Sequence, residues 1–184
     1  MEGHKGFICG GCFKNLFNGE KIKDIDVFFH NSTDFYQAVT YFKANKDYVL
    51  YYENFNVTAF MHVETKTVVE LCKKIFGSPE WILNRFDFTI TKFAYFKKQE
   101  IVDGEVKTHY TVLVHKDFFE HLHQKRLVVD DAIPYPMSTY ERMFRYAKYG
   151  YQPCRETKLR VALAIKALPE TEIVLGKSLY NGID

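Results

Sequence analysis

The sequence lacks the features that mark membrane and secreted proteins. Its 184 residues contain no apolar run long enough to cross a bilayer. The N-terminus, MEGHKGF, has no apolar stretch of the kind found in signal peptides. We therefore expect a cytoplasmic protein with no membrane partner. Internal repeats and low-complexity segments are also absent from the sequence.

Metal-binding and redox motifs are scarce. Among the four cysteines only Cys9 and Cys12 form a CxxC pair, and a structural zinc site needs a second pair. No HExxH motif is present, and the spacing of His115, His121 and His123 does not place them on one helix face. The CGGC segment is compatible with a thioredoxin-like redox pair or, alternatively, with buried free thiols.

The composition is that of an ordinary globular protein. Hydrophobic residues make up 47% of the chain and charged residues 26%, and 17 Phe and 13 Tyr are available for a core. A net charge of +2 is nearly balanced, so it does not by itself argue for a nucleic-acid partner. The length fits one domain with a small helical appendage.

Residues 6–29, GFICGGCFKNLFNGEKIKDIDVFF, contain the strongest pattern. Asp24 and Asp26 stand two apart in an apolar run, so in a strand they share one face about 7 Å apart, a span that hard cations can bridge. Gly10 and Gly11 would let the backbone approach a phosphate closely, because neither has a Cβ. If a helix follows, its free N–H groups point to the same place. The stretch therefore predicts a phosphate-binding turn that faces a metal-binding carboxylate pair.

This stretch resembles the signature GGxVRDxLLGxxxxDxD of class II CCA-adding enzymes and bacterial poly(A) polymerases, a branch of the polymerase-beta-type nucleotidyltransferases. The glycines and both aspartates fall in register, but Lys14 and Asn15 replace the family's Arg-Asp. Lysine keeps the charge without the bidentate fork, and asparagine cannot act as an anion. The resemblance implies that both aspartates bind Mg²⁺ or Mn²⁺. It also implies an NTP substrate contacted by Gly10, Gly11, Lys14 and Asn15.

A second segment, residues 85–95 (RFDFTITKFAY), resembles the family motif RRDFTINALAY, with Phe86 and Thr91 as departures. We expect this segment to be a strand with one embedded acid, Asp87. The resemblance implies that Arg85 contacts the nucleotide. A lone buried acid is costly unless it binds a cation or accepts hydrogen bonds, so Asp87 is also a candidate functional residue.

Members of this superfamily usually have a third carboxylate on a strand beside the first two. Two residues compete for that role in this chain. Glu70 matches the acidic position on the strand before the second motif, and Asp87 matches the acid of that motif itself. We prefer Asp87 slightly and keep both as catalytic candidates.

The C-terminal part contains a basic helical pattern. Residues 138–151 read as a helix with Ser138 as N-cap and Glu141 at the capping-box position. Arg142 and Arg145 belong to one basic stripe of this helix, which loosely resembles the family's PLRxxRxxRFAxxLGF helix. The stripe is either a groove for substrate phosphates or nucleic acid, or a solvated helix face.

The remaining elements follow from periodicity and turn residues. We expect an α+β fold whose mixed, mostly antiparallel sheet of nucleotidyltransferase type is flanked by helices. A head domain should span residues 1–133, and Pro134 and Pro136 mark the boundary of a neck-like helical extension, residues 134–184. The expected elements are helices at 34–45 (capped by Ser32 or Thr33), 79–84 (capped by Ser78), 116–124 and 155–168; strands at 48–52, 56–63, 67–72 and 108–115; and a hairpin at 99–107 around Asp103-Gly104.

The pattern as a whole favours an active metal-dependent nucleotidyltransferase, with ATP as the default NTP. The acceptor would be an RNA end, a protein or a small molecule. A catalytically inactive nucleotide- or nucleic-acid-binding relative of the same fold is the alternative, supported by the departures at Lys14, Asn15, Phe86 and Thr91. The CGGC redox domain is a third hypothesis, and it predicts a reactive thiol of low pKa at Cys9 or Cys12.

Overall fold

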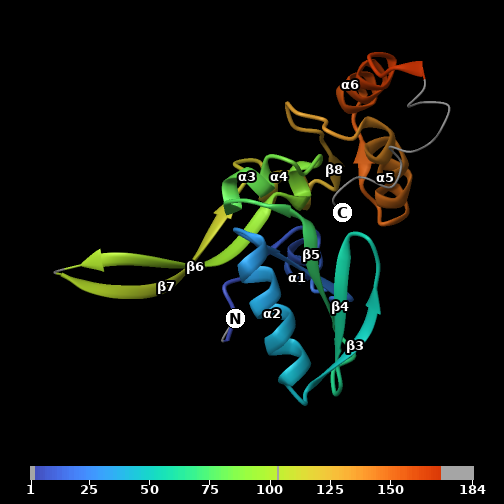
Figure 1. Ribbon diagram of the computed structural model, residues 1–184. Coiled ribbons are helices and arrows are strands. Elements are labelled where there is room, and N and C mark those ends of the chain that lie inside the picture. Colours follow the sequence, from blue (N-terminus) through green and yellow to red (C-terminus); the bar gives the residue numbers. More distant parts are fainter. Residues whose placement is uncertain (1–2, 103, 171–184) are drawn as a thin grey trace. The chain divides into compact units, whose positions relative to one another are not determined.

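The computed structural model describes residues 3–102 and 104–170 (Figure 1). The chain forms two compact units, one from Met1–Leu83 with Phe93–Val114 and the other from Asn84–Lys92 with His115–Asp184. These junctions do not coincide with the boundary expected after residue 133. The reason is that residues 93–114 return to the first unit and complete its sheet.

The first unit is built on a seven-stranded sheet with the strand order β3-β4-β5-β2-β1-β6-β7. Strands β2 and β5 run parallel, and the other neighbouring pairs are antiparallel. The expected α+β fold with a mixed, mostly antiparallel sheet is confirmed. The strands are β1 (Phe7–Cys9), β2 (Asp24–Phe29), β3 (Tyr48–Glu53), β4 (Val57–His62), β5 (Val68–Phe76), β6 (Phe93–Val102) and β7 (Glu105–Val114).

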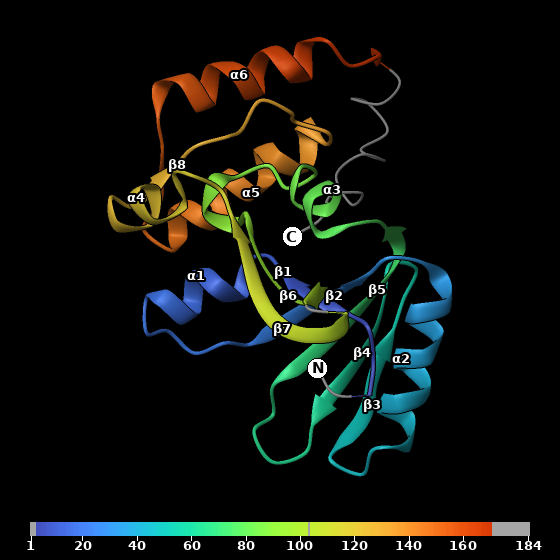
Figure 2. The same ribbon diagram turned by 90° about the vertical axis from the view of Figure 1, so that its left-hand side faces the viewer.

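Helix α2 (Ser32–Ala44) covers one face of this sheet, as Figure 2 shows. Its apolar side chains form a core with residues from three strands, and the cluster comprises Val27, Phe29, Phe35, Ala38, Phe42, Phe60, Val69 and Leu71. The N-cap is Asn31, whose side chain accepts a hydrogen bond from Asp34 N at 2.9 Å. The expected caps Ser32 and Thr33 instead lie within the first turn, because Asn31 takes the extended conformation that a cap requires.

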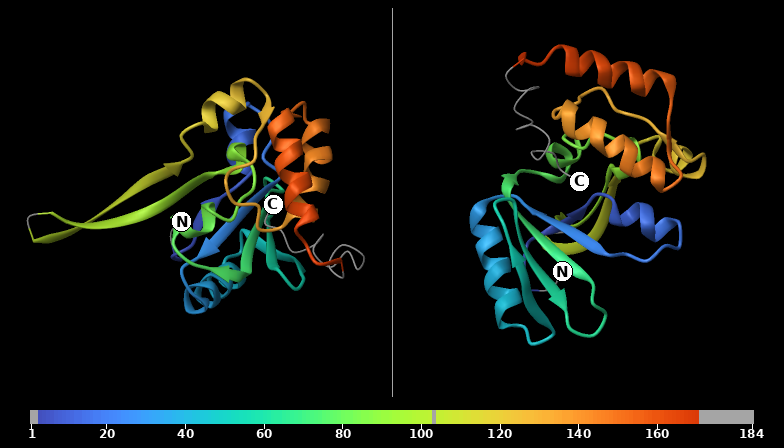
Figure 3. Two further views of the ribbon diagram at one scale, coloured as in Figure 1. Left: turned by 90° about the horizontal axis from the view of Figure 1, so that it is seen from above. Right: turned by 90° about the vertical axis from the view of Figure 1, so that its right-hand side faces the viewer.

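Two short helices join the strands of the first unit. Helix α1 (Cys12–Phe17) connects β1 to β2, and α3 (Pro79–Leu83) follows β5. The predicted start of α3 is confirmed, since Ser78 Oγ accepts a hydrogen bond from Trp81 N at 3.2 Å. The predicted hairpin is also present, and β6 and β7 extend as a two-stranded arm (Figures 1 and 3). Asp103, expected at its tip, lies outside the described residues.

The second unit is mainly helical. Helices α5 and α6 lie side by side in Figure 3. Its core includes Phe88, Phe118, Leu127, Tyr151 and Val161. The elements are a 3-10 turn η1 (Thr89–Thr91), α4 (Phe118–His123), β8 (Arg126–Leu127), α5 (Pro136–Lys148), β9 (Gln152–Pro153) and α6 (Arg155–Lys166), with β8 and β9 pairing in parallel.

Two expectations about the second unit are wrong. Residues 85–95 do not form one strand. Thr89–Thr91 form the 3-10 turn η1, and β6 begins only at Phe93. Thr91 Oγ1 donates to Phe88 O at 2.8 Å, and this local bond competes with strand pairing. Helix α5 begins at Pro136 rather than after Ser138, because proline is pre-organised for the first position of a helix.

Candidate functional site

The carboxylates of the first unit meet on one face of the sheet. Asp24 and Asp26 alternate with Ile25 along β2, so both side chains point to the same face. In the parallel pairing of β2 with β5, Asp26 lies opposite Glu70. Asp24 is exposed, whereas Asp26 and Glu70 are half-buried. Three acidic side chains are therefore placed on two adjacent strands, on the face opposite the one that α2 covers.

The glycine turn lies between β1 and α1. Gly10 has a φ of 104°, a left-handed conformation that side chains other than glycine rarely adopt. Its N–H donates to Phe93 O on β6 at 3.1 Å, which attaches the turn to the sheet. Gly11 has helical dihedral angles and occupies the N-cap position of α1 without a side-chain cap. The chain therefore turns sharply before α1, where it was predicted to do so.

The charges on β2 act on the thiols beside the glycine turn. Burial, the negative charges of Asp26 and Asp24, and the opposing effect of hydrogen bonds from the backbone together raise the pKa of Cys12 to about 12. Burial also raises the pKa of Cys9 well above its usual value, with the charges of Cys12 and Asp26 as further causes. The start of α1 thus lies within the electrostatic influence of the carboxylate pair. These shifts are opposite to the low thiol pKa that the redox hypothesis requires.

A tyrosine contacts Glu70, one of the two candidates for the third carboxylate. The hydroxyl of Tyr52, on β3, donates a hydrogen bond to Glu70 Oε1. Partial burial of the ring raises the pKa of Tyr52, and the hydrogen bond to Glu70 and the charges of Glu70, Asp26 and Asp24 raise it further. The phenol therefore stays protonated at neutral pH and acts as a donor. The carboxylate face thus extends from β2 to the edge strand β3.

Lys14 and Asn15 were both predicted to bind the nucleotide, and from α1 they contact the loop that leads into β2. Lys14 Nζ pairs with Glu20 Oε2 at 3.0 Å, and its side chain is only 6% exposed. Asn15 Nδ2 donates to Lys21 O at 3.2 Å. Both side chains thereby support the loop that leads into the Asp24 strand. Their contact with a nucleotide stays a prediction.

The other predicted residues belong to the second unit. Arg142 donates from Nε at 2.8 Å and from Nη2 at 2.6 Å to Asp87 Oδ2, and Phe88 N donates to Asp87 Oδ1 at 2.9 Å. Both charged side chains are buried. Arg85 Nη2 donates to the Tyr135 hydroxyl at 2.7 Å. Asp87 and Arg142 thus form a buried ion pair. The arginine balances the negative charge of Asp87, for which the sequence had suggested a bound cation or hydrogen bonds.

Arg145 differs from its neighbour on α5. Its side chain is exposed in the last turn of the helix, whereas Arg142, three residues earlier, is buried. The two arginines were expected to form one basic stripe. Of these two arginines, Arg145 is the one with the exposure that a phosphate-binding role on this helix requires.

No complete metal-ligand set is pre-formed. Within residues 3–102 and 104–170, no group of three His, Cys, Asp or Glu side chains is arranged to hold a metal ion. Mg²⁺, however, usually takes one or two carboxylates, keeps several waters and binds substrate phosphates. Asp24 and Asp26 supply hard oxygen donors of this kind. The donor set therefore fits Mg²⁺ or Mn²⁺ that enters together with a triphosphate.

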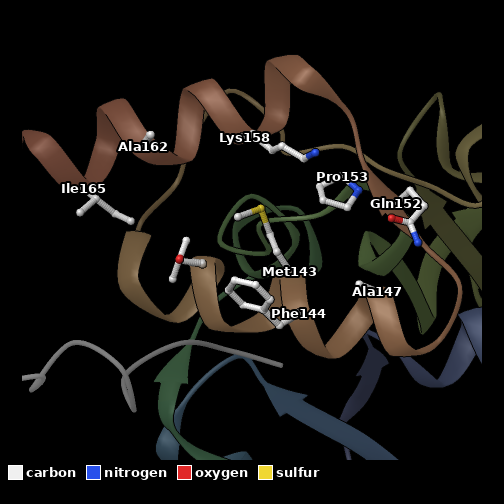
Figure 4. A pocket seen from close by; sticks show the side chains of 9 residues that line it. Met143, Phe144, Ala147, Gln152, Pro153, Lys158, Ala162 and Ile165 are labelled. Atoms are coloured by element: carbon white, nitrogen blue, oxygen red, sulfur yellow. The ribbon is translucent and has the colours of Figure 1, made fainter.

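The second unit has a groove of different character. A cavity of about 560 Å³ lies between α5 and α6, and Met143, Phe144 and Ile165 line it (Figure 4). Its lining is mostly apolar and contains no carboxylate. The described residues that line this groove therefore offer no carboxylate oxygen to a metal ion.

Comparison with known families decides the sequence relationship. Residues 1–125 match the model of the Gabija anti-defense 2 family, which is more than half of the chain. The protein belongs to the Gabija anti-defense 2 family. A relative from Bacillus phage SPbetaL7, itself named Gabija anti-defense 2, is 23% identical over 164 residues. That match covers 89% of this chain but only 38% of the relative.

Solved structures show the fold of this family member. A tRNA nucleotidyltransferase complexed with a primer tRNA and an incoming ATP analog superposes with a TM-score of 0.58 at 16% identity, covering 88% of this chain and 46% of that one. The Thermotoga maritima CCA-adding enzyme complexed with tRNA gives a TM-score of 0.57 at 15% identity, covering 88% of this chain and 38% of that one. The nucleotidyltransferase-type fold implied by the motif resemblance is confirmed.

In the described ranges, no helix is long and apolar enough to span a bilayer.

Sequence reasoning missed Tyr52. This residue lies in the run YVLYY, where aromatic and aliphatic residues occupy both faces of the strand and no alternation marks one of them. Tyr52 is connected to Glu70 through β4, and the register of three strands cannot be read from local spacing. The sequence offered only its high tyrosine content as a signal, and that content does not distinguish core tyrosines from tyrosines at a site.

Proposed function

We propose that the protein is a metal-dependent nucleotidyltransferase. It moves an NMP, most simply AMP, from an NTP to an acceptor, with release of pyrophosphate. The observation that carries this proposal is the pairing of Asp26 with Glu70 on adjacent strands, with Asp24 on the same face. The left-handed turn at Gly10 and the nucleotidyltransferase-type fold support the same conclusion.

Asp24 and Asp26 would hold Mg²⁺ or Mn²⁺. When bound, such cations lower the pKa of an attacking hydroxyl and neutralise the charge of the triphosphate and the leaving pyrophosphate. Asp24 is exposed and accessible to a cation that arrives with the nucleotide, whereas Asp26 is half-buried. The lower dielectric around Asp26 strengthens its interaction with a cation.

The chain's own contribution to the reaction is positioning. The backbone of Gly10 and Gly11 would accept a phosphate close to the sheet, because no Cβ occupies the turn. An acceptor oxygen then forms a bond to the α-phosphorus while the bond from that phosphorus to the β-phosphate bridging oxygen breaks. The products are the nucleotidylated acceptor, pyrophosphate and a proton. Alignment of these groups lowers the entropic part of the barrier.

Glu70 is the better candidate for the third carboxylate. It stands opposite Asp26 in the sheet register. Asp87 instead accepts two hydrogen bonds from the buried Arg142 and one from Phe88 N. Its negative charge is therefore already balanced within the second unit. We therefore propose Glu70 in place of Asp87, which the sequence had slightly favoured.

The family name guides the choice of acceptor. The phage relative is named Gabija anti-defense 2. The acceptor in this account is therefore a macromolecule or small molecule that the Gabija defence needs, and nucleotidylation inactivates it. An RNA end and a protein side chain are the two acceptors tested first.

The test is a transfer assay with each α-radiolabelled NTP, Mg²⁺ or Mn²⁺, and either total RNA or lysate of cells that carry Gabija. Wild-type protein is compared with Asp24→Asn/Asp26→Asn. The charge-matched control is Asp47→Asn/Glu64→Gln, which removes two acidic charges from exposed positions of the same unit. The proposal predicts labelled acceptor with the wild type and the control, and none with the Asp24/Asp26 variant.

A specific observation favours a second candidate, an inactive nucleotide-binding relative. Lys14 and Asn15, which replace the family's Arg-Asp, contact Glu20 and Lys21 in the loop that follows α1. That candidate predicts NTP binding without transfer to any acceptor, and binding that persists in Asp26→Asn. Label transfer that depends on the two aspartates rejects it.

A further inference from the structure

A single rung of the sheet links the edge strand β3 to the carboxylates. Tyr52 on β3 is paired with Ala59 on β4, Ala59 with Glu70 on β5, and Glu70 with Asp26 on β2. Side chains of paired residues lie on the same face of a sheet. Four residues from four strands therefore follow one another in a row, and the position between Tyr52 and Glu70 is occupied by alanine, which has the smallest chiral side chain.

The small side chain of Ala59 makes the long contact possible. Strands β3 and β5 are two strand spacings apart, about 9.5 Å. Across that distance the Tyr52 hydroxyl donates to Glu70 Oε1. Ala59 is fully buried. A larger residue at position 59 would occupy the space through which the tyrosine ring reaches Glu70.

The contact has a direct consequence for the carboxylate. A glutamate side chain without a fixed partner samples several rotamers, and ordering it costs conformational entropy. The hydrogen bond from Tyr52 fixes one oxygen of Glu70 and thereby the orientation of its carboxylate plane. A ligand that is already oriented binds a cation more tightly, and partners of this kind typically change metal affinity about 10- to 100-fold.

We propose that Tyr52 is a positioning residue, which holds Glu70 in the orientation needed to complete the metal site begun by Asp24 and Asp26. The inference rests on the proposed function, since it assigns Glu70 to that site. Tyr52 itself touches neither substrate nor metal in this account. Its role is to reduce the freedom of Glu70 before the cation arrives.

The test measures Mn²⁺ binding directly, by the loss of the free-ion signal in electron paramagnetic resonance. Tyr52→Phe removes only the hydroxyl that contacts Glu70. Tyr51→Phe is the matched control, because it removes a hydroxyl from the adjacent, exposed tyrosine of the same strand. We expect the Mn²⁺ affinity of Tyr52→Phe to fall about 10- to 100-fold and that of Tyr51→Phe to equal the wild type.

A second variant disrupts the hydrogen bond between Tyr52 and Glu70 without changing either residue. Ala59→Val fills the space between the ring and Glu70 and leaves both partners in place. We expect Ala59→Val to weaken Mn²⁺ binding as Tyr52→Phe does. The double variant Tyr52→Phe/Ala59→Val should bind Mn²⁺ as tightly as either single variant, because both changes break the same contact. A further readout is the NTP transfer rate as a function of Mg²⁺: Tyr52→Phe should need more Mg²⁺ and approach the wild-type rate at saturation.

The outcomes separate this inference from the proposed function. If the wild type binds Mn²⁺ through Asp24 and Asp26 but Tyr52→Phe binds it equally well, the role of Tyr52 is refuted and the proposed function stands. If wild-type binding of Mn²⁺ is unaffected by Asp24→Asn/Asp26→Asn, the metal site itself is refuted and both proposals fail. A circular dichroism spectrum of each variant verifies that it is folded before its Mn²⁺ titration.

Discussion

Replacement of Arg142 by methionine tests whether Asp87 belongs to a structural ion pair. The side chains of Arg142 and Asp87 are only 6% and 3% exposed, so solvent screens their interaction little. Arg142→Met would remove two charge-assisted hydrogen bonds, at 2.8 and 2.6 Å, and leave a buried carboxylate whose cation is gone. Breaking a buried pair in this way typically costs about 3–5 kcal/mol of unfolding free energy. We expect a loss of that size.

The assay is urea unfolding followed by far-UV circular dichroism, which reports on the helices of both units, including α5 and α6 of the second unit. The fluorescence of Trp81, the chain's single tryptophan, follows the first unit in the same experiment. The matched control is Arg145→Met, which removes the same charge from an exposed position of the same helix. Substitutions at exposed positions usually change stability by less than about 0.5 kcal/mol.

A double-mutant cycle completes this test. Asp87→Asn combined with Arg142→Met should cost less than the sum of the two single variants, by about 1–3 kcal/mol, because the two residues interact directly. A loss below about 1 kcal/mol in Arg142→Met would refute the structural interpretation. So would an Asp87→Asn variant that keeps its stability but loses Mg²⁺-dependent NTP binding, since that result would make Asp87 a metal ligand.

Three further predictions follow from single residues. Gly10→Ala should destabilise the protein by about 1–2 kcal/mol in thermal unfolding, because alanine is strained at a φ of 104°; an unchanged melting temperature would contradict this. Burial lowers the pKa of His4 to about 4, so its contribution to stability is present above pH 6.5 and is lost as pH falls toward 4. Urea unfolding should therefore show a decline of about 1–2 kcal/mol over this window after allowance for partial exposure. That decline should be absent in His4→Asn. In native protein a thiol reagent should modify Cys154 first. Partial burial raises the pKa of this thiol, but hydrogen bonds with Thr157, Arg126 and Glu156 outweigh that effect and lower it, whereas burial raises the pKa of Cys9, Cys12 and Cys72; a fast phase that survives in Cys154→Ser would contradict this.

The carboxylate pair and the glycine turn could be predicted because their geometry is local. Two aspartates separated by one residue in a strand share a face whatever the strand pairs with. The turn at Gly10 likewise depends on the backbone freedom of one residue. Their spacing was therefore enough to place both on a β1–α1–β2 segment.

The contact of Tyr52 with Glu70 could not be predicted in this way. It depends on the register of β3 with β4 and of β4 with β5, and a slip of one residue would move either side chain to the other face. The burial of Arg142 could not be predicted either, because its basic neighbours on the helix suggested an accessible basic stripe. Its partner Asp87 lies 55 residues earlier in the chain.

The strand expected over residues 85–95 failed for a different reason. Its phenylalanines, threonines and isoleucine favour strands on composition. However, Thr91 donates to Phe88 O and closes a 3-10 turn, so the segment bends before β6 begins at Phe93. A local side-chain bond can override propensity, and residue type alone does not reveal it.

The central claim is nucleotidyl transfer by the Asp24–Asp26 site. The most direct test incubates the protein and an acceptor-containing lysate with ATP labelled at the α-phosphate and, in parallel, with ATP labelled at the γ-phosphate. The account predicts that the α-label becomes covalently attached to an acceptor and the γ-label appears in pyrophosphate, and that Asp26→Asn abolishes both. Transfer of the γ-label to the acceptor, or α-label transfer that persists in Asp26→Asn, would contradict the account.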